Sequence, residues 1–335
     1  MRIVLRSPLD MHLHLREGAM LQAVTPATSS CFAGAVIMPN LVSPIDSLKK
    51  VRMYKEQINA AAHAASFTPH MTLFFKKYSR AELAAAKNEI IGIKLYPAGI
   101  TTQSENGVND FDTIGETLSL MEELQIPLLV HGESSGFVLD RESEFLEIYK
   151  RLAETFPKLH IIMEHITTAE AVDFLDKYPN VSATVTLHHL MITLDDVIGG
   201  LMEPDLFCKP IAKSPKDRER LREAVFSGHE KIMFGSDSAP HPRHKKECCG
   251  CAAGIFSAPV ALPMLTELFE DADRLNVLQN FVSGNACNRY GLCPSEKSVV
   301  LEEKSWEVPK LYGNVRQFGG GRRLRWSVSK VQGGH

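Results

Sequence analysis

Two histidines separated by one apolar residue stand near the start of the chain, in the segment "DMHLHLR" that begins at Asp10. Alternate residues of a β-strand face the same side, so this spacing predicts that His12, His14 and Arg16 share one face. Two imidazoles on one face can bind a metal ion, and a guanidinium beside them can bind a carboxylate. A lone His-x-His is weak support, because core and surface histidines with ordinary hydrogen bonds are also common.

Other residues of metal-binding type end further short apolar runs. They are Asn40 after "VIMP", Lys94 in "IIGIKLYP", His131 after "PLLV", His165 after "HIIME", His188 and His189 after "VSATVTL", and Asp237 after "KIMFGS". A random distribution would place such residues on helices and loops as well. Four imidazoles and one carboxylate suit Zn²⁺ best. The sequence therefore predicts a zinc site built from His12, His14, His131, His165 and Asp237.

Lys94 is the exception in this set, because a free ammonium group has only donors and cannot bind a metal. One interpretation is an ordinary lysine that reaches solvent or pairs with a carboxylate. In the other, neighbouring cations lower the pKa of the amine, and the neutral amine reacts with CO₂ to give a carbamate. The two carbamate oxygens can bridge two metal ions. The sequence alone permits both interpretations.

The elements that must position these residues alternate between apolar runs and helical patterns. Besides the opening segment, the runs that predict strands are 33–38, 71–75, 90–95, 127–130, 160–163, 181–186 and 231–235, and helical patterns include 47–65, 112–125, 144–156 and 168–178. Eight strands that alternate with helices favour an α/β fold, a (β/α)₈ TIM barrel of roughly 250 residues, with its active site at the carboxyl ends of the strands. A doubly wound sheet is the alternative, but no glycine fingerprint follows an early strand.

Composition narrows the class of protein. The chain has 335 residues and a formal net charge of -3, which gives no reason to expect a nucleic acid or an anionic membrane as partner. No apolar run approaches the ~20 residues of a membrane-spanning helix, and the N-terminus lacks a signal-peptide pattern. The odd cysteine count favours a reducing cytoplasm. We expect a barrel domain over residues 1–292 and a C-terminal extension packed on it over 293–335.

Several motifs together resemble one known family. "DMHLHLR", "VIMPN", "IKLYPAGITT", "LLVHGE", "EHITT" and "GSDSAPHPRHKKE" are similar, in the same order, to motifs of the bacterial-type dihydroorotases of the amidohydrolase superfamily. They cover about Leu9 to Pro259, and the closing "LRWSVSK" is similar but less diagnostic. The resemblance implies zinc-dependent, reversible cyclisation of N-carbamoyl-L-aspartate to L-dihydroorotate plus water, the third step of de novo pyrimidine (UMP) biosynthesis. Relatives of this type are often homodimers, so a homodimer is one expectation.

The resemblance also implies two Zn²⁺ per chain. The ligands would be His12, His14 and Asp237 for one ion and His131 and His165 for the other, with an N6-carboxylated Lys94 and a hydroxide as bridges. Asp237 would additionally be the catalytic residue that carries a proton from the attacking oxygen to the leaving nitrogen.

Six residues are implied to bind the substrate: Arg16, Asn40, Thr101, Thr102, His241 and Ala253. Arg16, Asn40 and His241 would hold its α-carboxylate, and Ala253 would offer backbone groups. The threonine pair lies in a loop that closes over substrate in relatives. Plainer alternatives are a rim salt bridge for Arg16, a helix cap for Asn40 and ordinary loop positions for the others.

Some residues fall outside the resemblance. Lys209 stands where the family has an apolar residue, so we expect its side chain to turn away from the pocket. The cysteines of "CCGC" at 248–251 are expected to be free thiols rather than a metal site. His188 and His189 are expected to lie outside the set of metal ligands.

Two other functions stay open at this point. The first is an amidohydrolase that acts on another cyclic amide, such as a hydantoin. The Arg16, Asn40 and His241 set argues against it, because that set requires a carboxylate on the substrate. The second is an inactive barrel that serves as a scaffold, which would be expected to lack some of the ligands.

Overall fold

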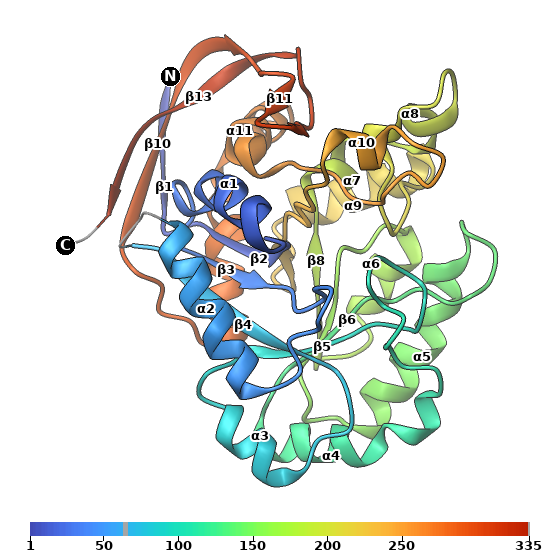
Figure 1. The fold of residues 1–335 in the computed structure, drawn as a ribbon. Helices are drawn as coiled ribbons and strands as arrows, with labels where there is room; N and C mark the ends of the chain where they lie inside the picture. The colour runs from blue at the N-terminus through green and yellow to red at the C-terminus, as the bar shows by residue number, and fades with distance from the viewer. Residues whose placement is uncertain (63–65, 334–335) are drawn as a thin grey trace.

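Eight short parallel strands form the central sheet, in the order in which they occur along the chain. They are β2 (Leu9–Leu13), β3 (Gly34–Ile37), β4 (Thr68–Phe74), β5 (Gly92–Leu95), β6 (Leu128–Val130), β7 (Ile161–Met163), β8 (Val181–Val185) and β9 (Ile232–Phe234). A parallel bridge between Leu13 and Ser238 brings the last strand back to the first. The computed structural model, which describes residues 1–62 and 66–333, therefore confirms the predicted barrel (Figure 1).

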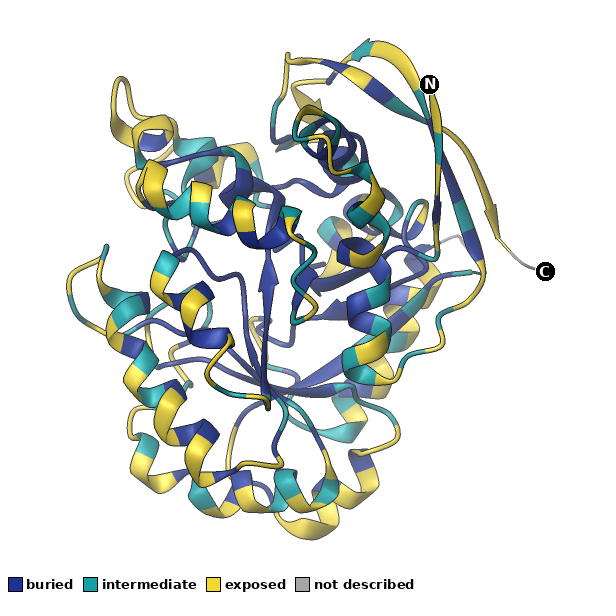
Figure 2. Cartoon of the chain, turned by 180° about the vertical axis from the view of Figure 1, so that it is seen from behind, coloured by how far each residue is buried: buried dark blue, intermediate teal, exposed yellow. Residues whose placement is uncertain are grey.

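Helices surround the barrel and cover its outer face. They are α1 (Gly18–Ser29), α2 (Leu48–Ala62), α3 (Arg80–Ala86), α4 (Gly115–Leu124), α5 (Arg141–Thr155), α6 (Ala169–Leu175), α7 (Leu187–Met191), α8 (Leu194–Ile198), α9 (Pro215–Phe226), α10 (Arg243–Lys246), α11 (Ala261–Asp271), α12 (Leu275–Gln279) and α13 (Asn285–Tyr290). In α2, Val51, Tyr54 and Ile58 recur at helical spacing and are buried. Figure 2 shows the same division around the barrel, with buried strands and with helices whose exposed residues face outward. The last three residues of the helix expected over 47–65 lie outside the described residues.

The barrel strands are buried on both faces, which is why they appear in the sequence as continuous apolar runs rather than alternating ones. Met11, Leu129, Ile162 and Met233 belong to an apolar cluster distinct from the large one between the barrel and its helices. Leu129 alternates with Leu128 and Val130, which belong to the outer cluster. Inward positions of the strands thus change from apolar to polar as the strands approach their carboxyl ends.

A second sheet lies beside the barrel. The first strand of the chain, β1 (Arg2–Arg6), pairs antiparallel with β10 (Lys297–Glu307), which pairs with β13 (Arg323–Gly333) (Figure 1). A small hairpin of β11 (Leu311–Tyr312) and β12 (Val315–Arg316) precedes β13. The division of the chain at residue 293 stays a prediction. The last two residues of the expected C-terminal extension, 334 and 335, lie outside the described residues. The sheet shows that the chain's first strand packs with this C-terminal region.

Two further findings concern the class of protein. Within residues 1–62 and 66–333, no helix is both long and apolar enough to cross a bilayer. The seven cysteines all lie in the described part of the chain and are free thiols.

Candidate active site and metal centre

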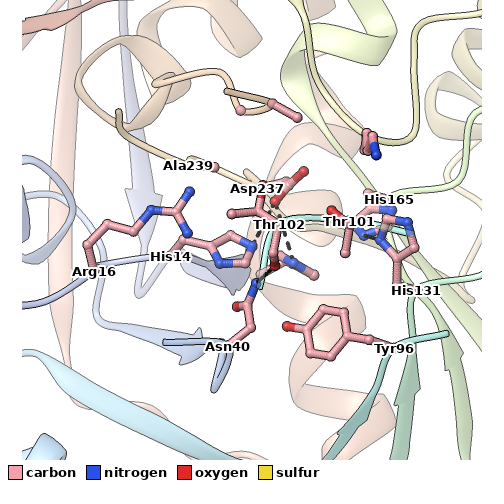
Figure 3. Close-up of a pocket in the computed structure, with 14 residues that line it drawn as sticks. His14, Arg16, Asn40, Tyr96, Thr101, Thr102, His131, His165, Asp237 and Ala239 are labelled. Atoms are coloured by element: carbon pink, nitrogen blue, oxygen red, sulfur yellow. Dashed lines mark hydrogen bonds and ion pairs between the residues drawn. The ribbon is translucent and has the colours of Figure 1, made fainter. Parts of the chain in front are cut away.

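A pocket opens at the carboxyl ends of the barrel strands (Figure 3). The predicted site residues that line it are His12, His14, Arg16, Asn40, Thr101, Thr102, His131, His165, Asp237 and Ala253. Tyr96, Lys209, Ala239 and Gly254 complete the lining. Of the predicted residues, Lys94 and His241 do not line it; Lys94 is fully buried, and His241 contacts Arg16 at 3.0 Å.

Three of the predicted metal ligands converge on one point. The Nε2 atoms of His12 and His14 lie 3.5 Å and 3.1 Å from Oδ1 of Asp237. One donor atom from each residue lies within 4.8 Å of the others. Two imidazoles and a carboxylate at this separation can bind a single divalent cation.

The other two histidines form an adjacent pair. Nδ1 of His131 lies 3.1 Å from Nε2 of His165, and the rings of His12 and His165 are 4.9 Å apart. The two groups of donors therefore lie next to each other in the pocket. In Figure 3, His14 and Arg16 lie on one side of Asp237, and His131 and His165 lie on the other.

Lys94 is buried among these residues, and its ammonium nitrogen has no hydrogen-bond partner within the described part of the chain. Burial lowers the pKa of Lys94 to about 8, although the charges of Glu164 and Asp237 partly oppose the shift. A buried, unpaired ammonium group is costly, whereas a neutral amine or an anionic carbamate between two cations is not. The surroundings of Lys94 thus fit the carbamate interpretation.

Two carboxylates that sequence reasoning missed fix the orientation of the histidines. Oε2 of Glu164 lies 2.8 Å from Nδ1 of His12, and Oε2 of Glu133 lies 2.7 Å from Nε2 of His131. Metal-binding histidines usually donate their second ring N–H to such a partner, which leaves the other nitrogen free for the metal. The sequence does place each glutamate close to a predicted ligand, which could have suggested this role: Glu164 directly precedes His165, and Glu133 follows His131 by two residues.

The backbone at two strand ends takes the left-handed conformation, which is uncommon outside glycine. His165 and Asp237 both have a φ of 42°. The N–H of His165 donates to Oγ1 of Thr184 at 2.7 Å, and the N–H of Asp237 donates to the carbonyl of His12 at 2.9 Å. These bonds hold the two residues in a strained conformation, as is frequent at functional sites. The turn lets Glu164 and His165, although consecutive, both reach the barrel interior.

The prediction that regular alternation along a strand places His12, His14 and Arg16 on one face is wrong in part. His12, His14 and Arg16 do line one pocket, but β2 ends at Leu13 and its pairing with β3 is irregular after Asp10. Oδ1 of Asp10 accepts the N–H of His12 at 3.2 Å, and Arg16 has a φ of 61°. A local bend after the strand, rather than regular alternation, therefore directs the last of the three residues into the pocket.

Arg16 is held at the pocket by several contacts. Its Nε donates to the carbonyl of Pro240 at 3.1 Å, and its own carbonyl accepts from the hydroxyl of Tyr54 at 2.7 Å. Nε2 of His241 lies 3.0 Å from both Nη2 of Arg16 and the carbonyl of Ala253. Burial and the charge of Arg16 lower the pKa of His241 to about 3, so this imidazole is neutral. Arg16 thus supplies a positive charge beside the predicted metal ligands.

The loop that carries Thr101 and Thr102 is tied to two neighbouring loops. Nδ2 of Asn40 donates to the carbonyl of Thr102 at 2.9 Å, and Nζ of Lys209 donates to the carbonyl of Ile100 at 2.6 Å. The expectation that Lys209 turns away from the pocket is wrong, because the side chain lines the pocket and reaches the loop. Its charge is satisfied by a backbone carbonyl, which an apolar residue could not bind.

Asp237 stays ionised in this environment. Burial alone would raise the pKa of its carboxyl group, but the hydrogen bond from His14 and the electrostatic influence of the nearby imidazoles of His12, His14 and His188 hold the pKa below its usual value. Burial lowers the pKa of His14 to about 4, so its imidazole is neutral. Neutral imidazoles and an ionised carboxylate are the protonation states in which these groups bind metals.

The remaining sequence predictions can be placed as well. Cys248, Cys249 and Cys251 form no disulfide, and Cys248 and Cys249 are exposed; that they bind no metal stays a prediction. His188 and His189 follow β8 as expected, are fully buried and do not line the pocket.

Comparisons with known proteins show which family the chain resembles. The family model described as amidohydrolase matches residues 10–264. A dihydroorotase of Helicobacter hepaticus is 44% identical over 97% of this chain and 97% of its own length. One of Helicobacter pylori is 42% identical over 99% and 100%, respectively.

Solved structures agree too. A dihydroorotase of Campylobacter jejuni matches with a TM-score of 0.94 and 52% identity, covering 98% of both chains. A dihydroorotase of Saccharomyces cerevisiae, in complex with 5-fluoroorotic acid, has a TM-score of 0.93 and 35% identity, covering 99% of this chain and 98% of its own. An L-hydantoinase of Arthrobacter aurescens, at 16% identity and a TM-score of 0.83, shares the fold.

Proposed function

Because this chain belongs to the dihydroorotases of the amidohydrolase family, we propose that the pocket at the ends of its barrel strands binds two metal ions and the substrate. The enzyme is a cyclic amide hydrolase that interconverts N-carbamoyl-L-aspartate and L-dihydroorotate in pyrimidine biosynthesis. The family is metal-dependent.

The observation that carries the assignment is the combination of metal-type donors with a cation in one pocket. His12, His14 and Asp237 converge on one point, and Arg16 lies beside them. A guanidinium fork matches a carboxylate in a bidentate manner. A substrate that is both a cyclic amide and a carboxylic acid fits this combination better than a hydantoin without an acid group.

We assign the ligands as the sequence suggests, because the donor set fits two divalent cations. His12, His14 and Asp237 would hold one ion, His131 and His165 the other, and a carboxylated Lys94 would bridge them. The orphaned amine of Lys94 is the structural observation in favour of the bridge. When bound, Zn²⁺ ions would polarise the amide carbonyl and lower the pKa of a shared water. Glu164 and Glu133 would keep His12 and His131 in the required tautomers.

Asp237 is the proposed proton carrier. In hydrolysis its carboxylate would take a proton from the attacking oxygen and return it to the ring nitrogen that leaves. In cyclisation it would accept the proton of the carbamoyl nitrogen as that nitrogen attacks the side-chain carboxyl group. A lowered pKa keeps Asp237 ionised and ready to accept.

The substrate's α-carboxylate would lie against Arg16, Asn40 and His241. His241, being neutral, would act as a hydrogen-bond partner rather than as a second charge. The backbone at Ala253 and the loop of Thr101 and Thr102 would cover the rest of the substrate. Assembly into a homodimer stays a prediction.

Steady-state turnover with two substrates tests this proposal. The zinc-loaded enzyme should hydrolyse L-dihydroorotate and leave hydantoin essentially untouched. Arg16→Met should raise the KM for dihydroorotate by about 10-fold or more, because a charge-assisted bidentate contact is lost. Arg16→Lys should recover only part of this loss. Comparable turnover of hydantoin by the parent enzyme, or an unchanged KM in Arg16→Met, would refute the assignment of the carboxylate site.

A further inference from the structure

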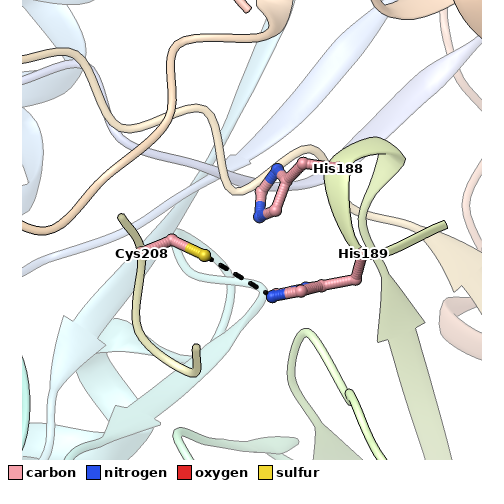
Figure 4. A group of neighbouring side chains, drawn as sticks. All are labelled: His188, His189 and Cys208. Atoms are coloured by element: carbon pink, nitrogen blue, oxygen red, sulfur yellow. Dashed lines mark hydrogen bonds between the residues drawn. The ribbon is translucent and has the colours of Figure 1, made fainter. Parts of the chain in front are cut away.

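A second group of metal-type side chains lies outside the pocket. His188 and His189, on α7, approach Cys208, which lies in the segment before α9 (Figure 4). One donor atom from each of the three lies within 4.8 Å of the others, and all three side chains are buried. We call these three residues the His–His–Cys cluster. Neither the resemblance nor the comparisons give it a role.

The ring nitrogens of His188 are the first observation that suggests a ligand for the cluster. Both of its ring nitrogens are buried and have no hydrogen-bond partner within residues 1–62 and 66–333. Leaving a buried polar group unpaired costs about 1–3 kcal/mol, so such groups are rare in native proteins. In Figure 4, one of these nitrogens faces the space between the sulfur of Cys208 and the ring of His189.

His189 is oriented as a ligand would be. Its Nδ1 lies 2.9 Å from Oγ1 of Thr186, and its Nε2 lies 3.6 Å from Sγ of Cys208. In a metal-bound form, Nδ1 would carry the proton and donate to Thr186, and Nε2 would have a free lone pair on the side of the thiol. A separation of 3.6 Å is close to the edge of a tetrahedron around zinc with bonds of about 2.3 Å to sulfur and about 2.0 Å to nitrogen.

A fourth donor lies at the same place. The carbonyl oxygen of Pro210 is 3.0 Å from Nε2 of His189 and 3.2 Å from Sγ of Cys208. Without a metal, the imidazole and the thiol both donate to this one oxygen. With a metal, the oxygen, the sulfur and one nitrogen of each imidazole would be its four candidate ligands.

We propose that His188, His189 and Cys208, completed by the carbonyl of Pro210, form a further binding site for one divalent cation that accepts sulfur and nitrogen ligands, with zinc as the best match. Binding would form a bond between the metal and Cys208 Sγ and release the thiol proton to solvent. Burial raises the pKa of this thiol to about 12, so the metal-free cluster is neutral. A bound cation would pair with the resulting thiolate, and both nitrogens of His189 would then be used.

The proposed cation site is connected to the active-site pocket along the polypeptide chain. Cys208 directly precedes Lys209, which lines the pocket and binds the loop of Thr101 and Thr102. A cation bound to Cys208 and the carbonyl of Pro210 would fix the backbone on both sides of Lys209. The proposed role is therefore structural support of one wall of the pocket, and it requires no contact with the substrate.

Cobalt substitution can test the site, because the ligands assigned in the pocket contain no sulfur. The experiment uses a full-length chain in which Cys248, Cys249, Cys251 and Cys293 are replaced by serine, so that neither the exposed thiols nor the partly exposed Cys251 can contribute. Loaded with Co²⁺, this protein should show a sulfur-to-cobalt charge-transfer band in the near ultraviolet. Cys208→Ser should abolish the band and lower the bound metal by about one equivalent per chain.

Two further variants make the result decisive. Cys287→Ser removes another partly buried thiol and should leave both the band and the metal content unchanged. His188→Gln keeps every thiol and should weaken cobalt binding at the cluster by about 10-fold or more, since one of its few ligands is lost. Circular dichroism would establish that each variant is folded. Absence of the band before Cys208 is changed, or its persistence in Cys208→Ser, would overturn the proposal. Failure of dihydroorotate turnover would bear on the pocket and not on this result.

Discussion

Asp237 is the residue on which the proposed chemistry depends most directly. Its carboxylate lies 3.1 Å from Nε2 of His14 and 3.5 Å from Nε2 of His12, and it faces the pocket. The same group is therefore placed both to bind a metal and to exchange a proton with the substrate. Substitution at this position should separate loss of chemistry from loss of fold.

Asp237→Asn should lower kcat for dihydroorotate by about 10²–10⁴-fold, because the amide cannot accept the proton that general base catalysis requires. Asp195→Asn, which changes an exposed aspartate on α8, should leave kcat unchanged. Spectrophotometric turnover measures the effect, and circular dichroism monitors the fold. A kcat within a few-fold of the parent enzyme would show that Asp237 does not carry the proton.

Lys209 is a second residue whose effect can be isolated. In Lys209→Met, the bond of 2.6 Å to the carbonyl of Ile100 is lost, so the loop of Thr101 and Thr102 should open more often. Because the side chain is only partly buried, we expect a rise in KM of roughly 3–10-fold, with a smaller change in kcat. Lys209→Arg should restore part of the affinity, and Lys216→Met on the exposed face of α9 should change nothing. Identical KM values for the parent and Lys209→Met would show that the bond does not hold the loop.

If Lys94 is carboxylated as proposed, assembly of the metal site should depend on pH. Only the neutral amine reacts with CO₂, and the pKa of about 8 means that the neutral fraction rises as the pH increases towards 8. At a fixed concentration of dissolved CO₂, reactivation of metal-free enzyme by zinc should be about 10-fold faster per pH unit between pH 6 and 7.5, and should level off above pH 8. Recovered dihydroorotate turnover provides the measurement. A rate that is independent of pH, or of CO₂, would contradict carboxylation of Lys94.

At the scale of elements, the strands and their ends show which features of the structure can be predicted from the sequence and which cannot. Residues such as Leu129 and Met233 lie in buried parallel strands, whose continuous apolar runs are visible without a structure. The irregularity of β2 after Asp10 and the left-handed conformation of His165 and Asp237 have no comparable signal, because they depend on hydrogen bonds to neighbouring strands. The order of site residues was therefore predictable, but the geometry of Arg16 was not.

The carboxylates Glu133 and Glu164 show the same limit for the site. In the sequence they are ordinary acidic residues next to predicted ligands, and only the fold shows that they face His131 and His12. Lys209 is the opposite case. Its departure from the family was visible in the sequence, but the carbonyl of Ile100 that it binds lies 109 residues away along the chain.

Gly235 provides a test of how closely β9 must approach β2. A Cβ atom at this position would lie 2.9 Å from Cβ of His12 and 3.0 Å from Cβ of Thr184, closer than normal contacts allow. Gly235→Ala should therefore displace His12, and turnover should fall by about 10–100-fold, since small misplacements of catalytic groups are costly. Gly250→Ala, where an added Cβ meets nothing within 4 Å, is the matched control. Full activity of Gly235→Ala would show that the two strands can separate without cost to the site.

At the scale of the whole molecule, the barrel and the smaller sheet join the two ends of the chain. The pairing of β1 with β10 places the first strand beside the C-terminal region, next to the segment that supplies His12 and His14. The position of the pocket could be predicted from the barrel, because polar residues lie at the ends of predicted strands that are far apart in the sequence. The pairing of β1 with β10 could not be predicted, since the sequence of a short exposed strand does not identify its partner.

Metal content per chain, measured together with turnover, would show whether this pocket performs the dihydroorotase reaction with bound metal ions. We expect that at least about two equivalents of metal per chain accompany full turnover, that chelation removes metal and activity together, and that zinc with bicarbonate restores both. Turnover that persists after the metal has been removed, or fully metal-loaded protein that does not convert dihydroorotate, would show that the pocket does not work in this way.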